Sequence, residues 1–392
     1  MRLLSRSQEK LVPAWQERSA VWLGQGLAIA ASFATAFSGT MALLRWSPLQ
    51  WAIAPSPPIS PAVADELPDN SAPPPAAFEF TLTAVGDSGW TRSHQRINRY
   101  QQGFRRAYFQ FDPKRQYLGD LNYLNWETSV GIQCDQFWAL PTDKTFAFVT
   151  HPQELRDAID LGFNLIGLAN NHSFDCLRSP EGQGVNQTLK HLQDIQEKAS
   201  QLLVFSGVRQ SSQVQPKAQQ FSLPNGQIPV LMISAYVGGD RNYCQKVICA
   251  SQLNRYQSLL KQHRGLRILA LHSWNPASHA QLKRILQRSL QQGLIDVGIG
   301  SGPHIAERVE IISTPRGPGI YTSSLGNFIH PSLMAQPYNL MLSSRWSYQP
   351  DQQQLKLQSV TTLEISCTPS TCQPRRQKLL WSQRNSSNRS QS

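Results

Sequence analysis

Nine polar residues that could bind metal ions or transfer protons follow apolar segments in the middle of this 392-residue chain. Carboxylate, amide and imidazole donors together suit manganese, iron or zinc, and no cysteine belongs to the set. Two such ions about 3.5–4 Å apart can activate water and clamp a phosphoryl oxygen, so the set predicts a hydrolytic metal centre. The nine residues are Asp87, Asn125, Glu127, Asn170, Asn171, His172, Asp175, His272 and His304.

Each of these residues also has an ordinary structural explanation when it is considered alone. An aspartate directly after a strand, such as Asp87, is commonly a turn former or a helix cap. A solitary histidine, such as His272 or His304, is more often a hydrogen-bonded core residue than a ligand. The run Asn170-Asn171-His172 is more informative, because three polar groups after an apolar strand are hard to explain by packing. The inference therefore depends on the joint pattern.

Alternating strands and helices are predicted around these residues, which indicates a layered α/β domain. Almost every polar cluster falls just after a predicted strand. Ligands of open α/β sheets bind at the carboxyl ends of strands, so we expect these strand ends to converge on one site. Strands are predicted over 78–85, 121–126, 163–169, 229–235, 266–271, 295–299, 309–312 and 320–323. Helices are predicted over 152–161 (with Thr150 as a possible cap), 184–199 and 278–291.

The first 77 residues predict a targeting segment and a linker. No charged residue occurs over 20–44, a run long enough to span a bilayer. Basic residues are more frequent before this run, which predicts that residues 1–19 are cytoplasmic and that the following domain is extracytoplasmic. Ala34-Thr35-Ala36 resembles a cleavage site, so a single-pass inner-membrane anchor and a cleaved signal remain alternatives. Residues 45–77 are rich in proline and predict a semi-extended linker.

The composition is that of a folded chain with a positive surface. Hydrophobic residues make up 40% and charged residues 16%, which excludes a collagen, a coiled coil and a wholly disordered chain. The net charge of +12 suits an anionic surface or substrate, and no nucleic-acid motif concentrates it. The basic, polar end over 374–392 predicts a disordered tail, which leaves 78–373 as the folded domain.

The six cysteines fit disulfide bonds in an exported domain. Cys244 and Cys249 are five residues apart, as are Cys367 and Cys372, and this spacing suits small closed loops. Buried or unpaired thiols remain the alternative. A zinc finger, a serine-hydrolase elbow and a phosphate-binding loop are disfavoured because C-x-x-C, G-x-S-x-G and G-x-x-x-x-G-K-S/T are absent.

Several short motifs occur in a fixed order between residues 78 and 330. The blocks A-N-N-H-S-F-D (169–175) and S-L-G-N-F (324–328) are the most specific. The others are Gly86-Asp87, Asn125-Trp126-Glu127, Gly184 with Thr188-Leu189, His272, and Gly300-Ser301-Gly302-Pro303-His304. Together they resemble the bacterial CapA family, named for capsule and poly-γ-glutamate synthesis proteins and related to calcineurin-like metallophosphoesterases.

The resemblance implies a metallophosphatase-like fold, with β-sheets between helices and a site for two divalent ions. It implies His172 as a catalytic residue, to which we add Asp175. Substrate binding is assigned to Asn125, Asn170 and Asn327. The implied metal ligands are Asp87, Glu127, Asn171, His272 and His304.

The chain departs from the family pattern at two places. Gly302 stands where the family commonly has the first histidine of H-P-H, and His272-Ser273-Trp274 stands where it has H-W-G. One imidazole is therefore missing, which predicts reduced occupancy of one metal and a gain of metal on Gly302→His. His279 and His330 are nearby candidates to replace the missing imidazole, but their spacing in the sequence does not show that either does so.

Three functions are compatible with these observations. The first is an exported, membrane-anchored, metal-dependent phosphoesterase acting in capsule, poly-γ-glutamate or envelope polymer synthesis. The second is a non-catalytic assembly factor that binds an anionic envelope polymer or its synthesis machinery. The third is a structural envelope protein without a ligand. Metal content separates the first from the other two.

Overall fold

The computed structural model describes residues 76–91, 100–138, 146–182, 184–331, 336–369 and 371–383. All of them belong to one compact unit, Asn70–Ser392. The cytoplasmic segment, the membrane run and all but the last two residues of the proline-rich linker lie outside the described residues and remain predictions. Among the described residues, no helix has both the length and the apolar character needed to cross a bilayer.

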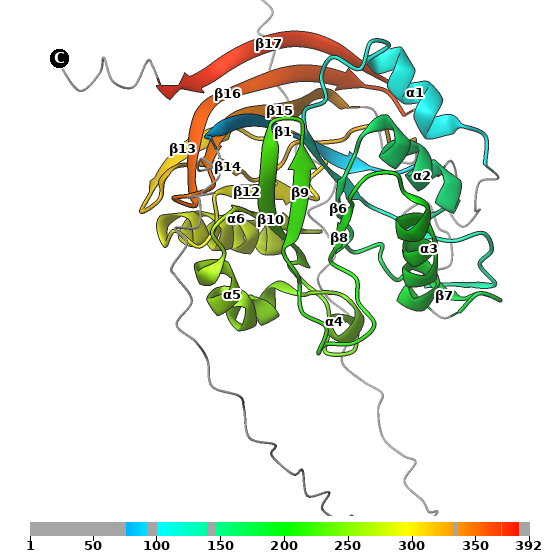
Figure 1. The fold of residues 1–392 in the computed structure, drawn as a ribbon. Helices are drawn as coiled ribbons and strands as arrows, with labels where there is room; N and C mark the ends of the chain where they lie inside the picture. Colours follow the sequence, from blue (N-terminus) through cyan, green and yellow to red (C-terminus); the bar gives the residue numbers. More distant parts are fainter. Residues whose placement is uncertain are drawn as a thin grey trace, which may run out of the picture. The chain divides into compact units, whose positions relative to one another are not determined.

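Two β-sheets form the centre of the domain (Figure 1). The first sheet has seven strands in the order β17 (Cys372–Ser382), β16 (Gln354–Cys367), β15 (Gln336–Gln349), β1 (Phe78–Ser88), β2 (Leu121–Trp126), β6 (Leu165–Gly167) and β8 (Val204–Ser206). The second has six strands in the order β13 (Val309–Thr314), β14 (Gly317–Thr322), β12 (Val297–Ser301), β11 (Leu266–His272), β10 (Gly226–Tyr236) and β9 (Gln219–Leu223). Two short pairs complete the strands: β3 (Ser129–Val130) with β5 (Val149–Thr150), and β4 (Gln136–Phe137) with β7 (Cys176–Arg178).

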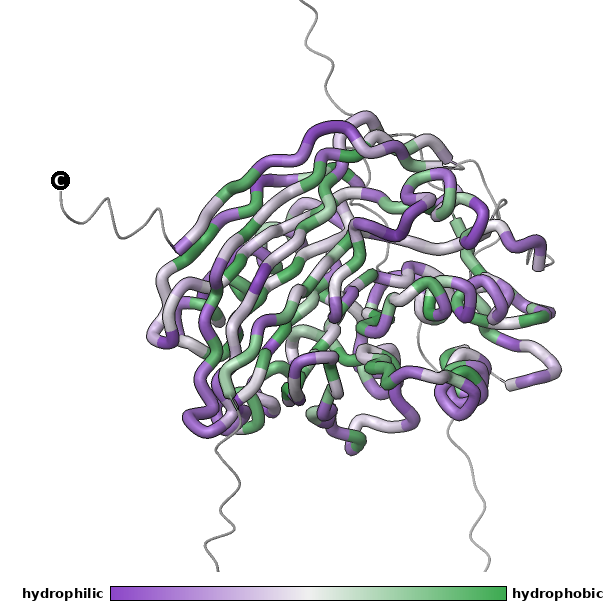
Figure 2. Tube along the Cα trace, turned by 45° about the horizontal axis from the view of Figure 1, so that its top comes forward, coloured by the Kyte–Doolittle hydropathy of each residue, from purple (hydrophilic) through white to green (hydrophobic). Residues whose placement is uncertain are grey.

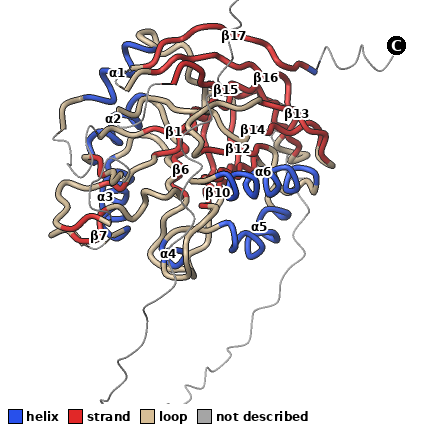
Figure 3. Tube along the Cα trace, turned by 180° about the vertical axis from the view of Figure 1, so that it is seen from behind, coloured by secondary structure: helices blue, strands red, loops and turns tan. Residues whose placement is uncertain are grey.

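The two sheets bury a shared core and carry helices on their outer faces. Leu82 of β1, Met232 of β10 and Ile268 of β11 belong to one buried cluster between the sheets. A second cluster joins the first sheet to α1 (Gly103–Phe111), α2 (Pro152–Leu161) and α3 (Val185–Lys198). A third joins the second sheet to η1 (Ala250–Tyr256), α5 (Gln257–Gln262) and α6 (Pro276–Gln291), so the strands lie between two groups of helices (Figure 3). The short α4 (Tyr243–Lys246) follows β10. The predicted layered α/β domain is confirmed.

Most predicted elements are present, with shifted ends. The strand predicted over 121–126 matches β2, and the helix predicted over 152–161 matches α2. The predicted cap of α2 was wrong: Thr150 lies in β5, and His151 Nδ1 accepts the hydrogen bond from Gln153 N. Pro152 at the first helical position has no N–H to satisfy, which is why proline is tolerated there.

The predicted disordered tail over 374–392 is wrong for its first part, because β17 extends to Ser382. This strand pairs antiparallel with β16, and a disulfide between Cys367 and Cys372 closes the turn that joins them. Leu380 and Trp381 pack against the core between the sheets. An edge strand exposes one side to solvent, so its charged residues are compatible with sheet structure. Hydrophobic and hydrophilic residues alternate along the long strands (Figure 2).

All six cysteines form disulfides. Cys244–Cys249 and Cys367–Cys372 form the two predicted closed loops, and the remaining pair is Cys134–Cys176. Cys176 directly follows Asp175, so this third disulfide fixes the end of the loop that follows β6.

Candidate metal centre

The predicted metal ligands meet where parallel strands of the two sheets end. β1, β2 and β6 are parallel neighbours in the first sheet, and β10, β11, β12 and β14 are parallel neighbours in the second. Each ligand lies at or after the carboxyl end of one of these strands, as is typical of ligand sites in α/β folds. The ligands are Asp87 in β1, Glu127 after β2, Asn171 after β6, His272 at the end of β11 and His304 after β12.

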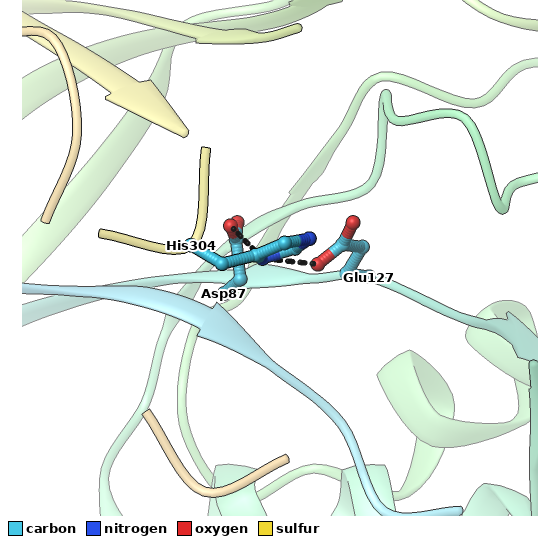
Figure 4. Close-up of side chains that lie close together, drawn as sticks. All are labelled: Asp87, Glu127 and His304. Atoms are coloured by element: carbon cyan, nitrogen blue, oxygen red, sulfur yellow. Dashed lines mark ion pairs between the residues drawn. The ribbon is translucent and has the colours of Figure 1, made fainter. Parts of the chain in front are cut away.

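Asp87, Glu127 and His304 form a first group of possible ligand atoms, all within 4.8 Å of one another (Figure 4). His304 Nδ1 lies 3.2 Å from Asp87 Oδ2 and 3.8 Å from Glu127 Oε2. The backbone φ of His304 is +59°, an unusual value for a residue with a side chain. Two carboxylates and one imidazole are a suitable set for a borderline divalent ion.

His272 and Asn171 form a second group of possible ligand atoms, next to the other carboxylate oxygen of Glu127. His272 Nε2 lies 3.4 Å from Glu127 Oε1 and 2.7 Å from Asn171 Oδ1. Burial lowers the pKa of His272 to about 3, so its ring is neutral, as a metal ligand must be. The two groups share Glu127, and this arrangement fits two adjacent ions with one bridging carboxylate.

The surroundings of Glu127 give an independent test of whether a metal fits. The residue is 1% exposed, and neither carboxylate oxygen has a hydrogen-bond partner among the described residues. Burying a carboxylate without hydrogen bonds is costly, and burial, followed by the charge of Asp87, raises the pKa of Glu127 to about 8. A bound cation would compensate this charge, so the residues present fit a metal centre.

Neighbouring polar groups orient the ligands. Asp87 accepts hydrogen bonds from Asn125 Nδ2 at 2.7 Å and from Gly302 N at 3.0 Å. Burial disfavours its charge, but the hydrogen bond and charge of His304 and the hydrogen bond from Asn125 outweigh burial and lower the pKa of Asp87 to about 2. His272 Nδ1 lies 2.9 Å from Ser301 Oγ, a contact that leaves Nε2 for a metal.

The predicted catalytic residues form a pair beside the ligands. His172 Nδ1 lies 2.6 Å from Asp175 Oδ2, and the ring packs on Phe148 with 4.3 Å between ring centroids. Burial opposes protonation of His172, but the Asp175 carboxylate outweighs it and raises the pKa of the imidazole. Ser129 fixes the loop that carries His172 and Asp175. Its Oγ donates a hydrogen bond to His172 O and accepts one from Asp175 N. Sequence reasoning missed Ser129, which lies in a two-residue strand and carries no motif signal.

The three asparagines assigned to substrate binding are all buried. Asn125 donates to Asp87, and Asn170 Nδ2 donates to Trp126 O. Asn327 Oδ1 lies 2.9 Å from His304 Nδ1. These buried side chains hold ligands and loops in place through their hydrogen bonds, and their contact with substrate stays a prediction.

A comparison with protein families agrees with this site. The family model of the bacterial capsule synthesis protein PGA_cap matches residues 81–332, well over half of the chain. The chain belongs to this family. The matched range contains every residue of the two donor groups and the His172–Asp175 pair. A search of curated proteins found no match.

The solved structures found to be similar to this chain include a novel phosphatase from Mycoplasma pneumoniae. It is 12% identical, with a TM-score of 0.40, and the alignment covers 74% of this chain and 95% of that chain. A hypothetical protein from Thermus thermophilus is also 12% identical, with a TM-score of 0.39 and coverage of 73% and 99%. At this similarity neither structure bears on the chemistry of this chain.

The backbone conformation and a close neighbouring carbonyl explain why residue 302 is a glycine in this chain. Its φ is +113°, and a Cβ there would lie 1.6 Å from Ser273 O. The residue also donates its backbone N–H to Asp87. The expectation that Gly302→His restores a metal ligand is therefore wrong, because the backbone leaves no space for a side chain.

Gly302→Ala is expected to lower the free energy of unfolding by at least about 3 kcal/mol, through backbone strain and steric overlap. Gly317→Ala is the matched control, because Gly317 has a φ of +109° and no atom within 4 Å of the position that a Cβ would take. Gly317→Ala should lower the free energy of unfolding by about 1 kcal/mol, through backbone strain alone. Chemical denaturation of both variants measures the difference, and equal losses would contradict the steric explanation.

Metal affinity is expected to rise with pH. Burial opposes protonation of His304, but the Glu127 and Asp87 carboxylates raise the pKa of its imidazole to about 9. Without metal, His304 and Glu127 therefore both hold a proton at neutral pH, and binding must displace these protons. Calorimetric titration with Mn²⁺ between pH 6 and pH 8 should show affinity rising about tenfold or more per pH unit. A flat profile would contradict the role of these two ligands.

Proposed function

We propose that this chain is an exported, membrane-anchored, metal-dependent phosphoester hydrolase acting in the synthesis of a capsule or another anionic envelope polymer, such as poly-γ-glutamate. The observation that supports it most strongly is the buried carboxylate of Glu127, which lies between two donor groups and has no hydrogen-bond partner among the described residues. Membership of the capsule synthesis family supports the polymer as the biological context. A phosphoester is the proposed substrate class, because divalent ions in such a site can activate water and polarise a phosphoryl oxygen.

Two ions are the proposed cofactors. Asp87, Glu127 and His304 would hold one, and Glu127, Asn171 and His272 would hold the other. Divalent ions in such a site lower the pKa of water and polarise a phosphoryl oxygen. Manganese, iron and zinc all match these donors.

His172 is the proposed general acid. Its Nδ1 is engaged by Asp175, which fixes the ring and leaves Nε2 as the nitrogen that can donate a proton. Phe148 N also donates to Asp175 Oδ2, and this hydrogen bond holds the carboxylate in place. The raised pKa of His172 keeps a proton available at neutral pH for the oxygen of the leaving group.

The exported location is proposed from the charge asymmetry around residues 20–44 and from three disulfides, which are typical of oxidising compartments. A reporter fused after Ala77 tests it. Alkaline phosphatase, which is active only after export, should be active in this fusion. A fluorescent protein that matures only in the cytoplasm should remain dark, and the opposite pattern would contradict export.

A non-catalytic role in binding an anionic polymer is the second candidate. A groove of about 810 Å³ between β13 and the strands β15–β17 is lined in part by Arg308, Arg376 and Lys378. Acidic residues line it as well, and Arg376 is paired with Glu364 at 2.8 Å. Three basic and three acidic side chains line this groove, so their charges balance, and it supports polymer binding less than Glu127 supports a metal centre.

Hydrolysis by the full-length protein tests the proposed enzyme. Protein treated with EDTA and reloaded with Mn²⁺ should hydrolyse bis(p-nitrophenyl) phosphate or p-nitrophenyl phosphate, and the EDTA-treated sample should not. Protein that binds metal but hydrolyses neither ester would favour the second candidate.

A further inference from the structure

The disulfide between Cys134 and Cys176 joins a surface segment to the residue that directly follows Asp175. Asp175 is the carboxylate that engages His172 Nδ1 at 2.6 Å, and the loop that carries both residues is called the catalytic loop below. Neither cysteine is among the metal ligands, but their bond lies next to the carboxylate that orients the proposed general acid.

Besides the disulfide, backbone pairing holds this surface segment beside Asp175. The short strands β4 and β7 form a two-stranded pair that is separate from the two main sheets. Trp138 N donates to Asp175 O at 2.9 Å, and Asp135 N donates to Arg178 O at 2.8 Å. A two-stranded pair by itself has marginal stability in water, so we expect this pair to separate when the disulfide opens. Asp175 would then lose its hydrogen bond from Trp138.

The position of Asp175 matters because one of its carboxylate oxygens has two partners. Oδ2 engages His172 Nδ1 and also accepts a hydrogen bond from Phe148 N at 2.6 Å. A small shift of the backbone at Asp175 therefore changes the orientation of the imidazole, and misplacement by about 1 Å can lower a rate a hundredfold.

The part of the catalytic loop that carries the metal ligand Asn171 is held by other contacts. Asn170 Nδ2 donates to Trp126 O at 2.9 Å, and Ser173 Oγ donates to Leu168 O at 2.6 Å. These hydrogen bonds do not involve the surface segment. Opening the disulfide should therefore disturb the general acid and leave the metal ligands in place.

Cys134 offers the sulfur that a reductant can reach. It is half-buried, whereas Cys176 is fully buried and the four cysteines of the other two disulfides are at most 7% exposed. Thiol–disulfide exchange begins when a thiolate attacks one sulfur, so access to that sulfur helps to decide which disulfide opens. The Cys134–Cys176 bond is thus expected to be the first that is reduced in the folded protein.

We propose that the Cys134–Cys176 disulfide is a reducible link that keeps Asp175 and His172 arranged for acid catalysis, so that a dithiol lowers activity without removing metal. The inference rests on the hydrolase proposed above. One thiolate of the dithiol bonds to Cys134 Sγ, and Cys176 leaves as a thiolate. The second thiol then closes a disulfide within the reagent and releases Cys134, so the protein gains the two electrons and two protons that the dithiol loses.

Dithiothreitol and two phosphodiesters test the proposal on the full-length protein loaded with Mn²⁺. Diphenyl phosphate has a poorer leaving group than bis(p-nitrophenyl) phosphate and depends more on protonation. Once peptide mapping of trapped thiols shows reduced Cys134 and Cys176, kcat for diphenyl phosphate should fall about tenfold or more, and kcat for the nitrophenyl ester less than about twofold. Metal content should stay the same, and reoxidation should restore the activity.

Replacing both cysteines by Cys134→Ser and Cys176→Ser should give the same selective loss without a reductant. The matched control combines Cys244→Ser with Cys249→Ser, because the sulfurs of that disulfide contact Gly238 O and Val247 O, outside the catalytic loop. Both double variants should melt at a lower temperature, since each loses a closed loop. Only the first should change the ratio of the two kcat values, and reduced wild-type protein decides the question if that variant does not fold.

The outcomes separate the inference from the proposed function. Unchanged hydrolysis of both esters after reduction would show that the disulfide only stabilises the fold, and would overturn the proposal. An equal loss for both esters, loss of metal, or earlier reduction of either buried disulfide would overturn it as well. These outcomes leave the proposed hydrolase standing, whereas oxidised wild-type protein that hydrolyses neither ester would overturn both proposals.

Discussion

Glu127→Gln is expected to abolish tight metal binding and hydrolysis while the protein remains folded. The carboxylate is shared by both donor groups, so its loss removes a ligand from each. Neither oxygen has a hydrogen-bond partner among the described residues, so the neutral amide costs the metal-free protein little. Metal content, turnover of bis(p-nitrophenyl) phosphate and thermal melting measure the three effects.

Glu154→Gln is the matched control for this substitution. Glu154 is also fully buried, but its carboxylate accepts backbone N–H groups of Gly103 and Phe104 in α1 and of Gln101 just before it. Losing these charge-assisted hydrogen bonds should lower the free energy of unfolding by about 3 kcal/mol and leave metal affinity unchanged. If Glu127→Gln instead behaves like this control, destabilised and still metal-bound, then Glu127 is a structural carboxylate.

His172→Gln is expected to lower kcat by about 10²- to 10⁴-fold with unchanged metal content, because the substitution removes a general acid that is not a ligand. Asp175→Asn should give a smaller loss, since His172 remains but loses the carboxylate that orients it and raises its pKa. Steady-state kinetics with a phosphodiester that has a poor leaving group show the effect most clearly, because protonation matters most there.

His191→Gln controls for the loss of a histidine–carboxylate pair. His191 Nε2 in α3 lies 2.9 Å from Oε2 of Glu181, which precedes this helix, and this pair of the same kind takes no part in the metal centre. Its replacement should leave kcat unchanged. Equal losses of activity in His172→Gln and His191→Gln would indicate a general effect on stability and would argue against acid catalysis by His172.

The order of elements and most of the metal centre could be predicted from the sequence. Short apolar runs bounded by polar clusters predict buried strands, and parallel strands bring their carboxyl ends to one edge. Sequence alone could therefore place Asp87, Glu127, Asn171, His272 and His304 together, and the distances between their side chains agree with that prediction.

Other features depend on tertiary packing and left no periodic signal. Ser129 reaches the site from a two-residue strand, and Gly302 is explained only by the close approach of Ser273. The strand β17 was missed because its exposed basic residues resemble a disordered tail, whereas Leu380 and Trp381 anchor it to the core. The burial of Asn125, Asn170 and Asn327 likewise does not follow from the sequence pattern.

The most direct test of the metal centre is the number of divalent ions bound per full-length chain. Protein stripped with EDTA, reloaded with Mn²⁺ or Zn²⁺ and freed of excess metal can be analysed by mass spectrometry of the elements. We predict two ions per wild-type chain and loss of both in Glu127→Gln, because the two donor groups share that carboxylate. Wild-type protein without bound metal, or equal metal content in the two proteins, would contradict it.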